Sequence, residues 1–185
     1  MARNIMILNG GPRAGGNTAA LVEAFTHGAE SAGHTVTRFD LQTMNLHGCL
    51  GCGGGGKDPA SPCVQKDDMD LIYSAFQKAD TVVFASPMYY WAISSQLKCA
   101  IDRMYAIIEI DGGGRGPARD CALLMSAGVS TEENFEPVLQ YYKAFVSDMK
   151  WHDLGHVYAG GNYGPKDIQQ HPDQLEAARA LGASL

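Results

Sequence analysis

The sequence predicts an α/β fold: a five-stranded parallel sheet with helices on both faces. Five short segments of strand character alternate with segments whose apolar residues recur at helical spacing. Two of the strand segments, 81–85 and 121–125, are continuous apolar runs, which is typical of strands buried on both faces. The 185 residues contain no internal repeat and no evident linker, so we expect a single domain over residues 1–185.

The first half of the chain is predicted to contain three strands and two helices. The first three strands are predicted at residues 5–8, 35–39 and 81–85. Of these, 35–39 alternates in polarity and is rich in β-branched residues. Helical spacing predicts a helix over 16–32, and Gly33 ends it. Asp67 is a candidate cap for the next helix, with Asp70 three residues later. The apolar face of that helix is expected to comprise Leu71, Ile72, Ala75 and Phe76.

The second half continues the alternation. The predicted elements are a helix from Ser94 or Ser95, a glycine-rich turn at 111–119, a strand at 121–125, a helix at 132–149, a strand at 153–158 and a helix at 173–181. The residues of the helix after Ser94 that are expected to face inward are Leu97, Ile101, Met104 and Tyr105. In such sheets ligands bind beyond the carboxyl ends of the strands. The loops that we expect there are 9–18, 40–65, 86–93, 126–131 and 159–171.

Charge and hydropathy exclude several classes of protein. Acidic residues outnumber basic ones by 20 to 14, so no basic stripe suited to nucleic acid is expected. No apolar run approaches the ~20 residues of a membrane span. The start of the sequence lacks the layout of a signal peptide. We therefore expect a cytoplasmic protein without a nucleic-acid or membrane partner.

The most informative segment is the loop after the first strand, residues 9–18, which is rich in glycine and runs directly into a helix. The free amides and positive dipole end of a helix start favour an anion. Arg13 adds a forked cationic donor. A dinucleotide fingerprint is disfavoured by the glycine spacing, although Asp40 would support it, and a triphosphate loop by the missing lysine before Thr18.

We therefore predict a phosphate monoester held by loop amides, Arg13, Asn17 and Thr18. The alternative is an ordinary turn in which Asn17 or Thr18 merely caps the helix. A second loop, 86–91, carries three consecutive aromatic residues after a buried strand. They are suited to wall a flat aromatic ligand, or else form a subunit interface or core. The small residues of 126–129 would pass close beneath the same ligand.

Taken together, these motifs resemble the flavodoxin-like NADPH-dependent FMN reductase family over nearly the whole chain. The resemblance rests on the 9–18 loop, Cys49-Leu50-Gly51-Cys52, Asp67-Asp68-Met69, Ala79-Asp80, Ser86-Pro87-Met88-Tyr89-Tyr90-Trp91 and Leu97-Lys98-Cys99-Ala100-Ile101-Asp102-Arg103. It implies a three-layer fold with strand order 2-1-3-4-5 and FMN as cofactor. It also implies NADPH or NADH as co-substrate, a homodimer or higher homo-oligomer, and a small electron acceptor such as a quinone or flavin.

The resemblance also implies which residues hold the cofactor. They are Gly11, Pro12, Arg13, Gly16, Asn17, Thr18, Pro87, Met88, Tyr89, Tyr90, Trp91, Ser126, Ala127 and Gly128. We expect no catalytic side chain, because the flavin would carry the electrons from nicotinamide to acceptor. A non-enzymatic, flavodoxin-like electron carrier is the alternative function, and a binding module for another phosphate ligand is a third.

One departure from the family concerns Gly11, where relatives often carry a serine whose hydroxyl contacts phosphate. Its loss is expected to weaken phosphate binding by about 0.5–1.5 kcal/mol, while the backbone amide remains. Nothing marks a site for the extra phosphate of NADPH. Arg115 and Arg119 are candidates because they lie in the glycine-rich segment.

The five cysteines do not predict a disulfide framework, because the count is odd and no export signal is evident. Cys99 and Cys121 lie in apolar patterns and are expected to be buried. Related iron–sulfur flavoproteins bind a cluster through four cysteines, whereas Cys49, Cys52 and Cys63 are the only ones in the long loop. Gly55 stands where another would be expected. We therefore expect no metal, although zinc with His47 and a redox pair at Cys49 and Cys52 are alternatives.

Overall fold

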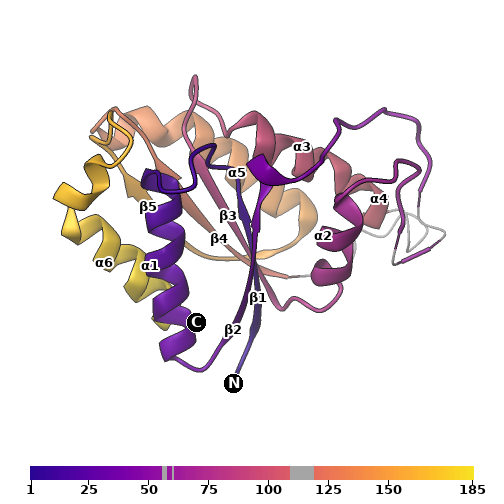
Figure 1. The fold of residues 1–185 in the computed structure, drawn as a ribbon, viewed down its shortest axis with the longest axis horizontal. Helices are drawn as coiled ribbons and strands as arrows, with labels where there is room; N and C mark the ends of the chain where they lie inside the picture. Colours follow the sequence, from indigo (N-terminus) through magenta and orange to yellow (C-terminus); the bar gives the residue numbers. More distant parts are fainter. Residues whose placement is uncertain (56–57, 60, 109–118) are drawn as a thin grey trace.

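The computed structural model describes residues 1–55, 58–59, 61–108 and 119–185 (Figure 1). Its centre is a five-stranded parallel sheet in the order β2-β1-β3-β4-β5, which confirms the predicted fold and strand order. The strands are β1 (Asn4–Asn9), β2 (Thr35–Asp40), β3 (Thr81–Pro87), β4 (Asp120–Ser126) and β5 (His152–Ala159). The strands run in one direction, so their carboxyl ends meet at one edge.

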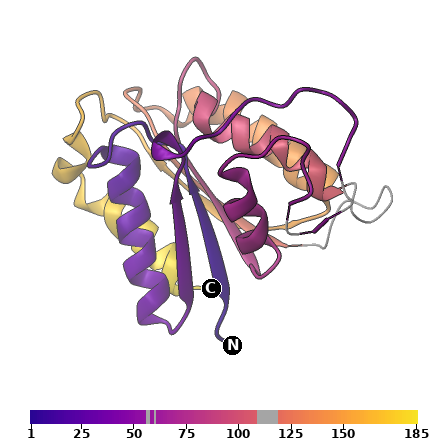
Figure 2. The ribbon, with the colours of Figure 1, turned by 45° about the vertical axis from the view of Figure 1, so that its right-hand side comes forward.

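Helices cover both faces of the sheet. They are α1 (Asn17–Ser31), α2 (Met69–Phe76), α3 (Ser95–Arg103), α4 (Tyr105–Ile108), α5 (Glu136–Met149) and α6 (Pro172–Ala183). Short 3-10 turns occupy Leu41–Thr43, Glu132–Phe135 and Asp167–Gln170. Helices α1 and α6 pack on one face, and α2, α3 and α5 lie on the other (Figures 1 and 2).

The alternation of side chains along each strand builds two separate core layers. In β1, Ile5 and Ile7 face the layer beneath α1 and α6, whereas Met6 and Leu8 face the layer beneath α2, α3 and α5. All seven residues of β3 are buried, as its continuous apolar run predicts. The sheet is therefore a rigid platform for the loops at its carboxyl edge.

Three predictions about individual residues are wrong. Leu71 is exposed, and Tyr73 is buried in its place on α2. Tyr105 is also exposed rather than inward. Ser86 and Pro87 belong to β3 rather than to the loop after it. The predicted turn at 111–119 lies outside the described residues except for its last position.

Among the residues that the structure describes, no helix combines the length and the apolar character that crossing a membrane requires.

Candidate functional site

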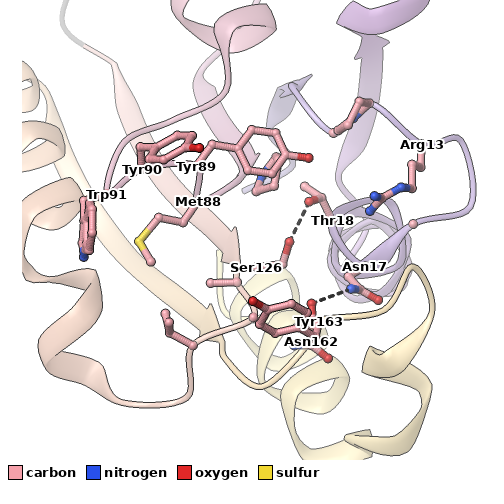
Figure 3. A pocket seen from close by; sticks show the side chains of 17 residues that line it. Arg13, Asn17, Thr18, Met88, Tyr89, Tyr90, Trp91, Ser126, Asn162 and Tyr163 are labelled. Atoms are coloured by element: carbon pink, nitrogen blue, oxygen red, sulfur yellow. Dashed lines mark hydrogen bonds between the residues drawn. The ribbon is translucent and has the colours of Figure 1, made fainter.

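The loops that follow β1, β3, β4 and β5 line one cavity of about 420 Å³ at the carboxyl edge of the sheet (Figure 3). Every residue predicted to hold the cofactor lines this cavity. Figure 3 shows Arg13 and Thr18 on one side and the aromatic residues of the 88–91 segment on the other. The structure thus brings together four loops that are far apart in sequence.

The start of α1 forms the polar end of the cavity. Its N-cap is Gly16, and no side-chain hydrogen bond caps the helix. The Gly16 N–H donates to the carbonyl oxygen of Arg13 at 3.1 Å, which folds the Arg13 backbone over the helix start. A 15-residue helix without a side-chain cap offers its first amides to an anion. The alternative in which Asn17 or Thr18 caps the helix is therefore wrong.

Asn17 performs a different task from the one predicted for its side chain. Its amide nitrogen donates to the carbonyl oxygens of Asn162 at 3.2 Å and Gly164 at 2.8 Å. Its amide oxygen accepts from the N–H of Ile168 at 3.3 Å. The side chain thus fastens the loop after β5 to the start of α1. Because these bonds occupy the side-chain amide, only the backbone N–H of Asn17 is left to bind an anion.

Hydrogen bonds connect the loop between β1 and α1 to the end of β2. The Gly11 N–H donates to Asn9 Oδ1 at 3.0 Å, and Asn9 Nδ2 donates to Asp40 Oδ1 at 2.7 Å. Arg38 Nε donates to the same carboxylate oxygen at 2.7 Å. The expectation that the Gly11 amide remains available for phosphate is therefore wrong, because Asn9 already accepts from it.

The aromatic segment after β3 is a tight hairpin. The N–H groups of Tyr89 and Ala92 donate to each other's carbonyl oxygens at 2.9 and 3.0 Å. The two residues between them, Tyr90 and Trp91, have φ angles of +48° and +61°. These values lie in the left-handed region, where bulky residues cost roughly 1–2 kcal/mol each. Tyr90 is 95% exposed, so the strained turn presents an aromatic side chain to solvent beside the cavity.

Two further residues line the cavity and were not predicted: Asn162 and Tyr163. Val129, which was expected beneath the ligand, also lines it. Tyr163 lies over Gly128, where a Cβ would come within 2.5 Å of its ring. A glycine at 128 thus lets the loops after β4 and β5 approach closely. Both loops were expected at this edge. An aromatic residue within the glycine-rich segment 160–164 was the sequence signal that could have identified Tyr163 as a lining residue. The described residues of loop 40–65 do not line this cavity.

The candidates for the extra phosphate of NADPH gain no support. Arg115 lies outside the described residues. Arg119 precedes β4 at the amino edge, opposite the cavity, and its guanidinium lies 5.0 Å from the centre of the Phe76 ring. Burial lowers the pKa of Arg119, partly offset by the charge of Asp80. The expectation that Arg119 binds the extra phosphate of NADPH is therefore wrong, because its side chain packs against Phe76 at the opposite edge of the sheet.

The strand order and the cavity at the carboxyl edge define a flavodoxin-like α/β protein whose first helix starts, without a side-chain cap, at that cavity. A family model for NADPH-dependent FMN reductase matches residues 3–165. The chain belongs to this family. Because the chain belongs to this family, its cofactor is FMN, and the family's name implies NAD(P)H as the reductant.

Several known proteins are similar to this chain. An iron–sulfur flavoprotein of Archaeoglobus fulgidus is 35% identical over 95 residues, which cover 51% of this chain and 42% of that protein. Bacillus subtilis YwqN, assigned to the NAD(P)H-dependent FMN-containing oxidoreductases, is 26% identical over 96% of this chain and 95% of its own length. The chain therefore spans about half the length of the first iron–sulfur relatives that it matches, but nearly all of YwqN.

Solved structures share the fold. An NAD(P)H:quinone oxidoreductase from Methanothermobacter marburgensis superposes with a TM-score of 0.76 at 24% identity, covering 100% of this chain and 96% of that one. An FMN-dependent NADH-azoreductase from Bacillus anthracis, solved with FMN, gives a TM-score of 0.67 at 15% identity and covers 100% and 99%. At these identities the likeness establishes the fold.

The cavity itself fits FMN. Its volume of about 420 Å³ lies within the usual ~300–1,000 Å³ of small-molecule sites. A helix start without a side-chain cap, next to the Arg13 guanidinium, suits a phosphate. Tyr89 and Met88 offer an aromatic and a sulfur surface for a flat ring at the other end.

Proposed function

We propose that this protein is an NAD(P)H-dependent oxidoreductase that holds FMN in the cavity at the carboxyl edge. It would pass electrons from the nicotinamide to a small planar acceptor such as a quinone or a flavin. One observation carries the proposal: a single cavity joins an anion-binding helix start to an aromatic hairpin. An elongated ligand with a phosphate at one end and a flat ring at the other matches both ends.

Each part of the chain has a distinct role in this proposal. The amides of residues 16–18 and the Arg13 guanidinium would bind the phosphate. Residues 87–91 and 126–128 would enclose the ring and keep water away from one of its faces. FMN supplies the redox chemistry when bound, accepting electrons from the nicotinamide and giving them to the acceptor. No side chain is required as a nucleophile or as a general acid or base.

The nature of the acceptor and the assembly belong to the same proposal. A planar acceptor is supported by the exposed aromatic rim of Tyr89, Tyr90, Trp91 and Tyr163 around the cavity mouth. The name of the Methanothermobacter neighbour supports a quinone. The same rim supports a homodimer, since exposed apolar patches mark association surfaces. The five cysteines are free, which supports a reducing, cytoplasmic location.

The phosphate assignment is tested by comparing FMN with riboflavin, which lacks the phosphate. Arg13→Ala is expected to raise the Kd for FMN about tenfold, as for the loss of one charge-assisted hydrogen bond, and to leave the Kd for riboflavin unchanged. Quenching of flavin fluorescence measures both. Lys143→Ala removes an exposed charge on α5, away from the cavity, and serves as the control. Equal losses for the two flavins would refute the phosphate site.

The reductase assignment is tested by anaerobic stopped-flow mixing of the FMN-loaded protein with NADPH or NADH. Bleaching of the flavin absorbance within seconds, followed by reoxidation with a soluble quinone, is the expected result. A flavin that binds normally and stays oxidised under both nucleotides would support the electron-carrier alternative instead. A protein that binds no FMN would favour a module for another phosphate ligand.

A further inference from the structure

A second cavity lies away from the cofactor site and shares no lining residue with it. Its volume is about 460 Å³, and it is formed by the loop segments 49–54 and 63–65 together with Asp102, Arg103, Tyr105 and Ala106. Three of the five cysteines line it: Cys49, Cys52 and Cys63. Cys63 is only 9% exposed, whereas Cys49 and Cys52 are exposed. The FMN chemistry proposed above makes no use of these thiols.

A buried arginine stands behind this cavity. The Arg103 side chain is 0% exposed, and its Nη1 donates to Asp67 Oδ2 at 2.7 Å and to the carbonyl oxygen of His47 at 2.8 Å. Its Nε is buried and has no hydrogen-bond partner among the residues that the structure describes. Arg103 and Cys63 line the same cavity. A sulfur anion at Cys63 would therefore share this cavity with a buried cation.

The two exposed thiols are also held by the backbone. The Gly51 N–H donates to Cys49 Sγ at 3.4 Å, and the Gly54 N–H donates to Cys52 Sγ at 3.4 Å. A Cβ at position 54 would lie 3.5 Å from Cys52 Sγ and 3.2 Å from Val64 Cγ1. Cys52 Sγ and Val64, the residue after Cys63, thus both lie next to Gly54. This shared neighbour is the reason for choosing Cys52 over Cys49 as the partner of Cys63.

We propose that Cys63 and Cys52 form a dithiol that hydrogen peroxide oxidises to a disulfide. The Cys63 thiolate attacks one oxygen of the peroxide, giving a sulfenic acid and releasing hydroxide. The Cys52 thiolate then attacks the Cys63 sulfur, forming the S–S bond and releasing a second hydroxide. With the two thiol protons included, two thiols and one peroxide give one disulfide and two waters. The bridge ties the 49–54 segment to the 63–65 segment.

A metal centre is the competing use of these cysteines. Among the residues that the structure describes, no three His, Cys, Asp or Glu side chains are arranged to hold a metal ion. Gly55 has a φ of +135°, and a Cβ there would lie 3.1 Å from the Pro62 carbonyl oxygen and 3.3 Å from Ala106 Cα. A further cysteine at that position would be strained. The geometry favours thiol chemistry at this cavity.

The test uses the whole protein, first reduced and desalted, then treated with one equivalent of hydrogen peroxide. We expect two of the five thiols to disappear and peptide mapping to show a bridge between Cys52 and Cys63. A bridge between Cys49 and Cys52, or any oxidation that leaves Cys63 as a free thiol, would overturn the proposal. So would one tightly bound zinc or iron ion per purified chain that shields Cys63 from the peroxide.

Variants then separate the two thiols. In Cys52→Ser the sulfenic acid at Cys63 should persist and be trapped by dimedone, because the resolving thiol is gone. Cys49→Ser is the matched control and should form the same bridge as the wild type at a rate within about twofold. If Cys49→Ser abolishes the bridge while Cys52→Ser retains a disulfide, the assignment of Cys52 is wrong. Both substitutions are at exposed positions, and circular dichroism checks that each variant is folded.

Discussion

The hydroxyl of Thr18, in the first turn of α1, lies 2.8 Å from the hydroxyl of Ser126 at the end of β4. Both residues are 4% exposed. One hydroxyl donates and the other accepts, so neither buried hydroxyl is left unpaired. This bond joins the loop proposed to bind phosphate to the loop beneath the proposed flavin ring. It fixes the separation of two elements that are 108 residues apart in sequence.

A double-mutant cycle tests this bond. Thr18→Val keeps the side-chain shape but leaves Ser126 unpaired, so we expect it to lower the free energy of unfolding by about 1–3 kcal/mol. Adding Ser126→Ala should cost little more, because both polar partners are then removed. Urea denaturation of the four proteins measures the coupling. Thr18→Ser retains a hydroxyl and should behave like the wild type. Strictly additive effects of Thr18→Val and Ser126→Ala would show that the bond contributes nothing.

The side chain of Asn17 offers a second test, because it anchors the loop that carries Tyr163. Asn17→Ala removes hydrogen bonds to Asn162, Gly164 and Ile168. We expect faster amide hydrogen exchange across residues 160–168 and a weaker affinity for FMN. The N–H of residue 17 remains in the variant, so the phosphate contact proposed for it is kept. Unchanged exchange in this loop would contradict the anchoring role.

The sheet could be predicted from the sequence because its signals are local. Buried central strands such as β3 are continuous apolar runs, and the parallel topology follows from their alternation with helices. The loops at the carboxyl edge then follow from the topology. The errors at Leu71 and Tyr105 have a different origin. In short helices, apolar spacing leaves the rotation of the helix about its axis undecided, and contacts with neighbouring elements decide it.

The parts of the site that could not be predicted depend on distant partners or on backbone strain. The amide of Asn17 bonds to residues 145 and 147 positions away, and no local pattern reveals such partners. The positive φ angles of Tyr90 and Trp91 contradict local preference, which favours asparagine or glycine in such hairpins. Arg103 lies in a motif that carried the resemblance to the family. Its complete burial against Asp67 is visible only in three dimensions.

The packing of α1 against α6 depends on two glycines. A Cβ at Gly28 would collide with the Arg179 carbonyl oxygen, and one at Gly182 with the Phe25 carbonyl oxygen. Both obstacles are backbone atoms, so we expect Gly28→Ala to lower the free energy of unfolding by about 1–3 kcal/mol despite its better helix propensity. Gly15→Ala, which has open space around it, is the control. Thermal or urea unfolding compares the two, and equal stability would refute close helix packing.

The missing hydroxyl at Gly11 gives a test that separates sterics from hydrogen bonding. A Cβ there would lie 3.0 Å from both Asn9 Oδ1 and Thr18 Cβ, so Gly11→Ala and Gly11→Ser suffer the same crowding. Only the serine adds a donor for the phosphate. We expect Gly11→Ser to bind FMN about 2- to 10-fold more tightly than Gly11→Ala, the value of one neutral hydrogen bond. Equal FMN affinities would show that residue 11 does not contact the phosphate.

The ion pair between Asp67 and Arg103 is expected to shape the stability of the protein in acid. Burial acts to raise the pKa of Asp67, but hydrogen bonds from Arg103 and from the N–H groups of Met69 and His47 outweigh it. The pKa of Asp67 therefore lies below its ordinary value in the folded protein. Its ionised form stabilises the fold above about pH 4, the unfolded value, and this stabilisation is lost as the pH falls through the folded pKa.

Asp67→Asn tests this linkage, because it leaves the buried Arg103 charge without its partner. At neutral pH the variant should lose roughly 3–5 kcal/mol of unfolding free energy. The difference from the wild type should shrink as the pH falls from about 4, the unfolded pKa, through the lower pKa that Asp67 has in the folded protein. Urea denaturation between about pH 3 and 7 measures both curves. Asp120, whose pKa is also lowered but whose side chain is 25% exposed, should give a smaller effect as Asp120→Asn. Parallel curves for Asp67→Asn and the wild type would show that the pKa of Asp67 is the same in the folded and the unfolded protein.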